Sequence, residues 1–252
     1  MRPDTGSIVL NTVWTILDAR FDLGLSLVVG VLVEQQNLGE EESVLHRQQG
    51  FEKVNRLLRA NQLPDHHEPL DLGEADPVSF DMYGYSGLHY LRRIASHLWS
   101  GGGLPLPGGP DAAHDPLSKR YYALMEQTKT KSSPRLSMMG SGFNHLMFHS
   151  DAEGFYVPVR FDDVLFDVYG IGVEGEILGS SLSLLTECEE LAKALELPLE
   201  LDPEAEEVWE ATEHQGSGDT CWERYGIESF TCLRLHYAAR ASVDCGAAIV
   251  FC

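Results

Sequence analysis

Basic residues are scarce in this 252-residue chain. Lys and Arg together number 18 against 39 Asp and Glu, which leaves a formal net charge of −21 when the histidines are neutral. Such a surplus of negative charge repels the phosphates of nucleic acids and the headgroups of anionic lipids. We therefore expect no nucleic acid and no membrane among the partners, whereas a basic protein would be attracted.

Cysteine is also rare, and no two cysteines have the spacing of a C-x-x-C motif. The five cysteines are odd in number and contain no C-x-x-C motif, so we expect neither a disulfide framework nor the usual paired-cysteine zinc site. They are Cys188, Cys221, Cys232, Cys245 and Cys252. Reduced, mostly buried thiols are typical of a cytoplasmic protein, and we expect that location.

Long apolar runs are missing as well. The main candidate, residues 23–33, has 11 residues, whereas a membrane-spanning helix needs roughly 20. It follows Asp18, Arg20 and Asp22, which is unlike the basic start of a signal peptide. Its β-branched residues and glycines indicate a buried strand or, as the alternative, a core helix. We therefore expect no export signal in this run.

The remaining composition is that of an ordinary globular protein. Hydrophobic residues make up 43% of the chain, and a chain of this length can bury a full core without disulfides or metal ions. We expect a single α+β domain over residues 1–252, with a flexible Gly/Pro-rich loop at about 100–116.

Several helices are predicted from apolar spacing and from capping residues. One begins at residues 40–42 and ends near Asn61, a second follows the N-cap Ser86, and a third has Asp115 as N-cap with Pro116 at its first position. Further helices are expected after Ser180 or Ser181, after Asp202-Pro203 and from Ser229.

Residues 143–161 predict a β-hairpin, with the first strand over 143–149. Alternation marks the second strand at Phe155, Val157, Val159 and Phe161. Residues 247–252 predict a terminal strand. Hairpins mixed with unevenly placed helices favour an α+β fold, with a mixed or antiparallel sheet and a central hairpin packed against several amphipathic helices.

His145, His149 and Asp151 form the most suggestive cluster of metal-ligating residues. The two histidines are four positions apart, which places them on one face of either a strand or a helix. With the carboxylate they would suffice for Zn²⁺ or Fe²⁺, and Glu153 and Tyr156 are candidate binding residues beside them. The same segment also fits an ordinary turn, in which case no cofactor is needed.

Charge is unevenly distributed along the chain. Residues 187–213 contain 11 acids and a single base, Lys193, on the polar faces of two predicted helices. The acids expected to contact a partner are Glu204, Glu206, Glu207 and Glu210. A solvated face explains this pattern, and so does a docking surface for a basic protein.

Two functions follow from these patterns. The first is an acidic binding or inhibitory protein of the immunity type that recognises a basic protein partner. The second is a metal-assisted hydrolase that uses the His145, His149 and Asp151 cluster. We favour the first, because no complete catalytic motif such as G-x-S-x-G is present, and whether the chain is an enzyme stays open.

Overall fold

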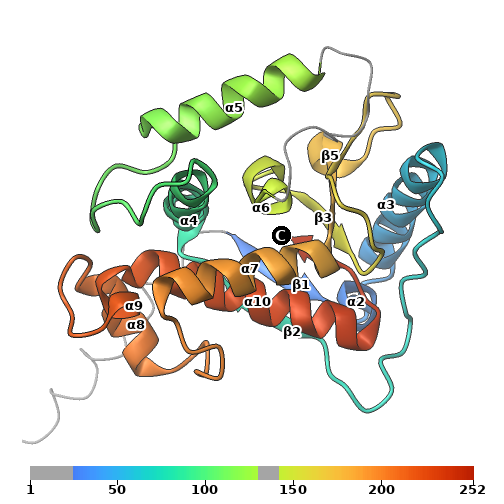
Figure 1. Ribbon diagram of the computed structural model, residues 1–252. Helices are drawn as coiled ribbons and strands as arrows, with labels where there is room; N and C mark the ends of the chain where they lie inside the picture. Colours follow the sequence, from blue (N-terminus) through green and yellow to red (C-terminus); the bar gives the residue numbers. More distant parts are fainter. Residues whose placement is uncertain (1–24, 130–141) are drawn as a thin grey trace, which may run out of the picture.

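A mixed sheet lies between two layers of helices in the computed structural model, which describes residues 25–129 and 142–252 (Figure 1). The strands are β1 (Ser26–Val29), β2 (Val78–Asp81), β3 (Gly154–Val157), β4 (Leu165–Phe166), β5 (Ile177–Ser180) and β6 (Ile249–Phe251). The helices are α2 (Val31–Asn37), α3 (Glu41–Ala60), α4 (Gly84–Trp99), α5 (Pro116–Lys129), α6 (Asn144–Phe148), α7 (Ser181–Leu195), α8 (Glu206–Glu213), α9 (Cys221–Arg224), α10 (Gly226–Cys245) and the short 3-10 helix η2 (Glu174–Glu176).

The six strands follow the order β2-β1-β6-β3-β5-β4. Strands β3 and β5 are parallel, with Phe155 opposite Leu178, and the other neighbours are antiparallel. This mixed sheet with separately placed helices confirms the α+β class. The terminal strand predicted at 247–252 is also confirmed, because β6 lies between β1 and β3.

Both faces of the sheet are buried at the inner strands β1, β6, β3 and β5, whereas the edge strand β2 is partly exposed. Val28, Phe155 and Val250 pack with the apolar residues of α2 and α3. Their neighbours Tyr156 and Phe251 pack on the other face, against a cluster supplied by α4, α6, α7 and α10. Successive side chains of a strand point to opposite faces, so a strand covered on both sides has no polar side.

The apolar run at residues 25–33 contains a buried strand, as predicted, but the strand ends at Val29. Gly30 then has a φ of 83°, a conformation that residues with a side chain rarely adopt, and α2 begins at Val31. Residues 23 and 24 lie outside the described residues. Within residues 25–129 and 142–252, no helix combines the length and the apolar character needed to cross a membrane.

Local capping accounts for two of the helices that were predicted correctly, α5 and α7. Asp115 Oδ1 accepts the N–H of Leu117 at 2.8 Å at the start of α5, and Ser180 Oγ accepts the N–H of Ser183 at 3.3 Å at the start of α7. Helix α3 ends where predicted, at the residue before Asn61.

Three predicted helix starts are wrong by a few residues. Helix α4 begins at Gly84, α8 at Glu206 and α10 at Gly226. Ser86 and Ser229 lie inside the first turns of α4 and α10, where their hydroxyls donate to the carbonyls of Tyr83 and Trp222. Asp202 accepts an N–H in the turn before α8.

The predicted hairpin is wrong. Its first strand is instead helix α6, because Glu187 of α7 accepts the N–H of His145 at 2.9 Å and of Leu146 at 2.8 Å, two donors of the first turn of α6. Its second strand exists as β3 but ends before Pro158, and it pairs with β6 and β5.

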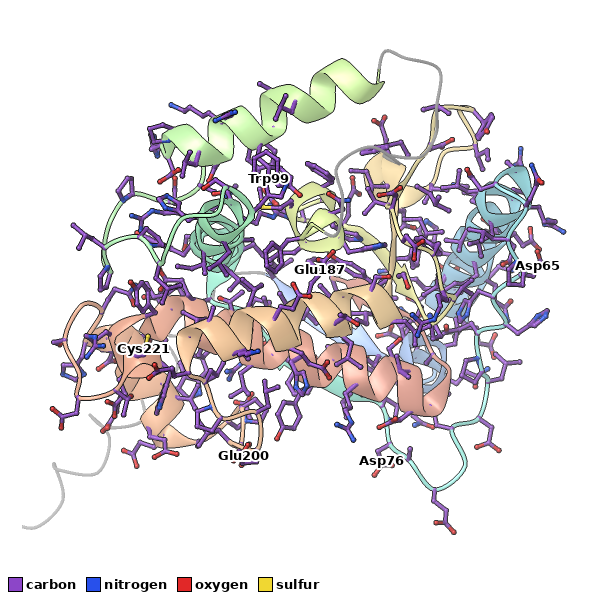
Figure 2. The ribbon with its side chains drawn as sticks, viewed as in Figure 1. Asp65, Asp76, Trp99, Glu187, Glu200 and Cys221 are labelled. Carbon is purple, nitrogen blue, oxygen red and sulfur yellow. The ribbon has the colours of Figure 1, made fainter. Side chains whose placement is uncertain are left out.

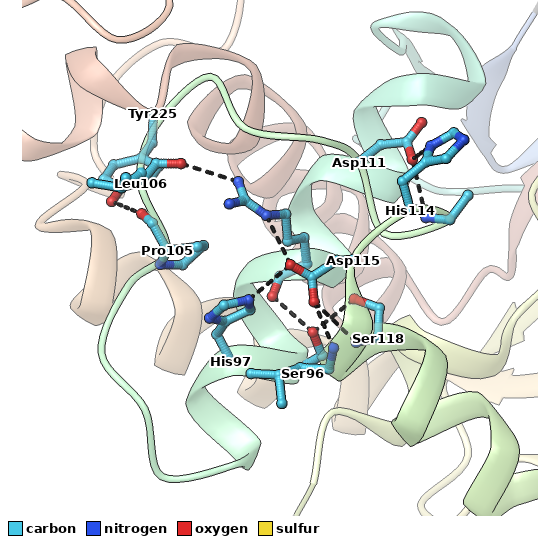
Figure 3. A network of polar contacts seen from close by, with 12 residues as sticks. Ser96, His97, Pro105, Leu106, Asp111, His114, Asp115, Ser118 and Tyr225 are labelled. Atoms are coloured by element: carbon cyan, nitrogen blue, oxygen red, sulfur yellow. Dashed lines mark hydrogen bonds and ion pairs between the residues drawn. The ribbon is translucent and has the colours of Figure 1, made fainter.

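The Gly/Pro-rich connection at residues 100–116 contacts both α4 and the start of α10 (Figure 3). Arg93 of α4 is buried and donates to the carbonyl of Leu106 at 3.1 Å and to Asp115 Oδ2 at 3.3 Å. The hydroxyl of Tyr225 donates to a second carbonyl of the connection. These contacts define the path of the connection over α4.

Candidate functional site

His145 is enclosed at the start of α6. Its Nδ1 accepts the N–H of Ser180 at 3.0 Å, so Nε2 carries the hydrogen of the neutral ring and donates to the carbonyl of Asp162 at 3.2 Å. Burial lowers the pKa of His145 to about 4. Backbone groups therefore engage both ring nitrogens at neutral pH.

His149 is also buried, and its ring stacks on Tyr156 with centroids 4.0 Å apart. Its Nδ1 lies 3.1 Å from the carbonyl oxygen of Ser150, and its Nε2 lies 3.1 Å from that of Phe155. Burial lowers the pKa of His149 to about 4. The neutral ring can donate to only one of these two oxygens.

Asp151 is directed towards α4. It pairs with Arg92 and lies 3.2 Å from His89 Nε2. Burial alone would raise the pKa of Asp151, but the hydrogen bond with His89 and the charge of Arg92 hold it well below the usual range. Arg92 also donates to the carbonyls of Leu146 and His149, so it joins α4 to the end of α6.

The three side chains predicted as metal ligands therefore have different neighbours. Backbone groups contact the rings of His145 and His149, and a guanidinium pairs with Asp151. In the part of the chain that the structure describes, no group of three or more His, Cys, Asp or Glu side chains could hold a metal ion. A Zn²⁺ or Fe²⁺ centre stays a prediction, which metal analysis of the purified protein would test.

The two binding residues predicted beside the metal lie in different surroundings. Glu153 is exposed in a turn where Ser150 Oγ accepts its N–H at 3.4 Å. Tyr156 is 1% exposed, and its hydroxyl donates to the carbonyl of His145 at 2.9 Å. Of these two residues, only Glu153 is therefore accessible to a partner.

Exposed acidic side chains are frequent on α7, on α8 and on the segment between them. Of the 11 acids in residues 187–213, Glu187 is buried and the other ten are exposed, with Lys193 as the one base in this stretch. The ten are Glu189, Glu190, Glu196, Glu200, Asp202, Glu204, Glu206, Glu207, Glu210 and Glu213. We call them the acidic surface. Figure 2 shows Glu200 at the margin of the molecule and Glu187 between α7 and α6.

The amphipathic character of α8 turns its acids outward. Val208 and Ala211 are buried in the core cluster that contains Phe230 and Leu233 of α10. Thr212 is buried as well, whereas the four glutamates of α8 are all exposed. The predicted partner residues Glu206, Glu207 and Glu210 are therefore accessible, and so is Glu204.

A fully buried cation lies beneath the acidic surface. Arg234 of α10 is 0% exposed, and its Cζ lies 3.6 Å from the ring centroid of Phe230 and 4.8 Å from that of Trp209. Its Nη2 donates to Glu204 Oε1 at 2.8 Å. Burial lowers the pKa of Arg234 to about 10, against the opposing charges of Glu204 and Asp81.

Sequence reasoning missed Arg92, Glu187 and Arg234. Arg92 and Glu187 lie on the apolar sides of amphipathic helices, and Arg234 lies in the part of α10 that is buried on all sides. A charged side chain in such a position needs a polar partner, and this context is the signal that could have marked all three. The sequence does not show which distant group supplies each partner.

These features define an acidic α+β protein that exposes many carboxylates on α7, on α8 and on the segment between them. The chain belongs to the family described as "putative DNA-mimic protein", whose model matches residues 23–251. No curated protein and no solved structure matches the chain.

Family membership corrects the functions expected from the sequence. Both the immunity-type protein for a basic partner and the metal-assisted hydrolase are wrong, because the description of the family is that of a DNA mimic. The expectation that nucleic acid has no part in the recognition was wrong for the same reason. A strongly negative charge repels DNA, but a protein also needs such a charge in order to resemble DNA.

Proposed function

We propose that this protein occupies the DNA-binding site of a DNA-binding protein, where its carboxylates take the place of phosphates. The acidic surface carries the proposal, because ten exposed acids are opposed within residues 187–213 by Lys193 alone. Lys and Arg side chains that bind the phosphates of DNA can also form charge-assisted hydrogen bonds to carboxylates. The family description supports the same conclusion.

The spacing of acids on α8 supports mimicry of a DNA strand. Four glutamates lie within the eight residues of α8, Glu206–Glu213. A helix rises about 1.5 Å per residue, so α8 carries roughly one charge per 3 Å of axis. One strand of DNA carries one phosphate about every 3.4 Å. Helix α8 therefore approximates the linear charge density of a single strand.

The same electrostatics would set the conditions under which binding occurs. A negative surface attracts a DNA-binding site before contact and raises the association rate, and added salt screens this attraction. Binding should therefore be strongest at low ionic strength and should weaken steadily as salt is added.

We also propose that the protein acts in the cytoplasm. All five of its cysteines are free, and Cys188 and Cys232 are buried. Unpaired cysteines are usual in a reducing compartment. Cell fractionation with an antibody against the protein tests this location.

Displacement of proteins from DNA tests the proposed function. An extract of the source organism is passed over double-stranded DNA-cellulose at low salt, and the column is eluted with the purified protein. We expect elution of one or a few DNA-binding proteins, which mass spectrometry would identify. The variant Glu206→Gln, Glu207→Gln, Glu210→Gln should elute much less of them.

Helix α3 offers a matched control. The variant Glu41→Gln, Glu42→Gln, Glu52→Gln also removes three exposed carboxylates, two of them from the first turn of a helix. Helix α3 carries arginines and a lysine beside its acids, so this control should elute as much as the unmodified protein. Failure to elute any DNA-binding protein, or equal losses in both variants, would refute the proposal.

A further inference from the structure

We infer that Arg234 positions the acids of the segment before α8 and of α8 itself. The inference rests on the proposed function, since it concerns the arrangement of the same acidic surface. Arg234 is a positioning residue, because its guanidinium is fully buried and cannot touch a partner.

Arg234 contacts a ring of α8 and a ring of its own helix. Its guanidinium packs on the ring of Trp209, in the middle of α8, and on the ring of Phe230, one turn earlier in α10. Trp209 and Phe230 also meet each other edge to face, with centroids 4.5 Å apart and planes at 67°. The guanidinium and these two rings therefore hold α8 against α10.

The bond to Glu204 fixes a carboxylate of the acidic surface directly. The Glu204 side chain is 57% exposed, but its Oε1 accepts from the fully buried Nη2 of Arg234. One carboxylate oxygen is thus held from below while the side chain still faces solvent. A carboxylate held in this way loses little side-chain entropy when a partner binds.

Stability alone does not explain a cation at this position. Nε and Nη1 of Arg234 are buried and have no hydrogen-bond partner among the described groups of the protein. Burying a charge is costly, and an apolar side chain of similar volume is often as stable or more stable in its place. Arginine differs from such a residue by its planar fork, which can stack on rings and bond to Glu204 at once.

A positioning role for Arg234 and an effect of net charge alone predict opposite changes in binding for the variant Arg234→Met. Arg234→Met makes the chain one unit more negative, so an account based on net charge alone predicts tighter binding to a DNA-binding site. Loss of positioning predicts weaker binding, because Glu204 and the α8 glutamates would no longer be held in one arrangement.

Arg240 supplies a matched control on the same helix. Its side chain is 65% exposed and lies 3.7 Å from Asp244, so it contacts solvent instead of the rings beneath α8. Arg240→Met changes the net charge by the same amount as Arg234→Met. It should leave the arrangement of α8 unchanged.

The test combines hydrogen exchange with displacement from DNA. In Arg234→Met, the backbone amides of Glu206–Glu213 should exchange about tenfold faster than in the unmodified protein, and elution of proteins from DNA-cellulose should require about tenfold more protein. Arg240→Met should leave hydrogen exchange in α8 unchanged. It should change elution only by a small gain. Arg234→Lys keeps the charge without the plane and should behave like Arg234→Met.

The outcomes separate this inference from the proposed function. Unchanged exchange in α8, stronger elution by Arg234→Met, or full recovery by Arg234→Lys would overturn the role of Arg234. If Arg234→Met does not fold, Arg234→Lys decides by the same two measurements. If the unmodified protein elutes nothing from DNA-cellulose, the proposed function fails, whereas exchange in α8 still decides whether Arg234 holds that helix.

Discussion

The carboxyl group of Glu187 accepts the backbone N–H of His145 at 2.9 Å, although 42 positions separate the two residues. Its other oxygen accepts the N–H of Leu146. A side chain of α7 thus caps α6, and this contact converts a segment with strand-like composition into a helix. It also leaves a carboxyl group entirely inside the core.

Glu187 should make the stability of the protein depend on pH. Burial raises the pKa of Glu187 to about 8, although the two N–H donors oppose the shift. Between the pKa of about 4.3 expected in the unfolded chain and that value, the folded protein holds a proton that the unfolded chain has lost. The contribution of Glu187 to the free energy of unfolding therefore falls as pH rises from about 5 to 8.

Urea unfolding at pH 5 and pH 8 tests this contribution. Glu187→Gln cannot ionise, so it should lose less stability between these two pH values than the unmodified protein loses. Other titrating groups are common to both proteins and cancel in the comparison. Parallel pH dependences in the two proteins would contradict a protonated Glu187 in the folded state.

The buried histidines should act in the opposite direction at lower pH. Burial lowers the pKa of His145 and His149 to about 4, so the folded protein resists a proton that the unfolded chain takes up near pH 6.5. Their contribution to stability therefore falls as pH drops from about 6.5 towards 4. Nitrogen NMR of the rings should show His145 neutral with hydrogen on Nε2 at pH 7, and still neutral at pH 5. A charged ring at pH 6 would refute this.

Phe155 of β3 should be among the most sensitive positions in the core. Its side chain is 0% exposed, and the centroid of its ring lies 5.2 Å from that of Phe51 on α3. Phe155→Ala should lower the free energy of unfolding by about 3–5 kcal/mol, as other large buried truncations do. Leu106→Ala, at a side chain that is 82% exposed, should change it by less than about 0.5 kcal/mol. Similar losses in both variants would contradict the burial of β3.

Gly226 allows the close approach of α8 to the start of α10. A Cβ atom added at this position would lie 1.9 Å from the carbonyl oxygen of Ala211, a backbone atom that cannot turn aside. Gly226→Ala should therefore lower the free energy of unfolding by about 1–3 kcal/mol. A Cβ atom added at Gly103 would have no neighbour within 4 Å, so Gly103→Ala serves as the control. Thermal unfolding of both variants decides, and equal melting temperatures would contradict the packing of α8.

Much of the fold could be predicted from local sequence. The side chains of Asp115 and Ser180 cap the residues that follow them, and the apolar residues of α3 repeat at helical spacing. Such signals involve only neighbours along the chain. The hairpin failed because the cap of α6 comes from Glu187, far along the chain, and no local pattern reveals a contact of that kind.

The candidate site was predictable only in part, because some of its features depend on local sequence and others on contacts between distant residues. The acids of residues 187–213 are visible in the sequence, and their exposure follows from the amphipathic pattern of α7 and α8. The contact of Arg234 with Glu204 is not visible, because it depends on how α10 packs beneath the segment before α8. The functional meaning of the charge could not be obtained either, since the same composition fits a solvated face and an imitation of DNA.

Direct competition with DNA is the measurement that tests the central claim. A DNA-binding protein eluted from DNA-cellulose is purified, bound to a fluorescent duplex at low salt, and titrated with this protein. The account predicts that the duplex is released completely. It also predicts that about tenfold more of the Glu206→Gln, Glu207→Gln, Glu210→Gln variant is needed for release, whereas the α3 control matches the unmodified protein. A ternary complex that keeps the duplex bound, or equal potency of the two variants, would contradict it.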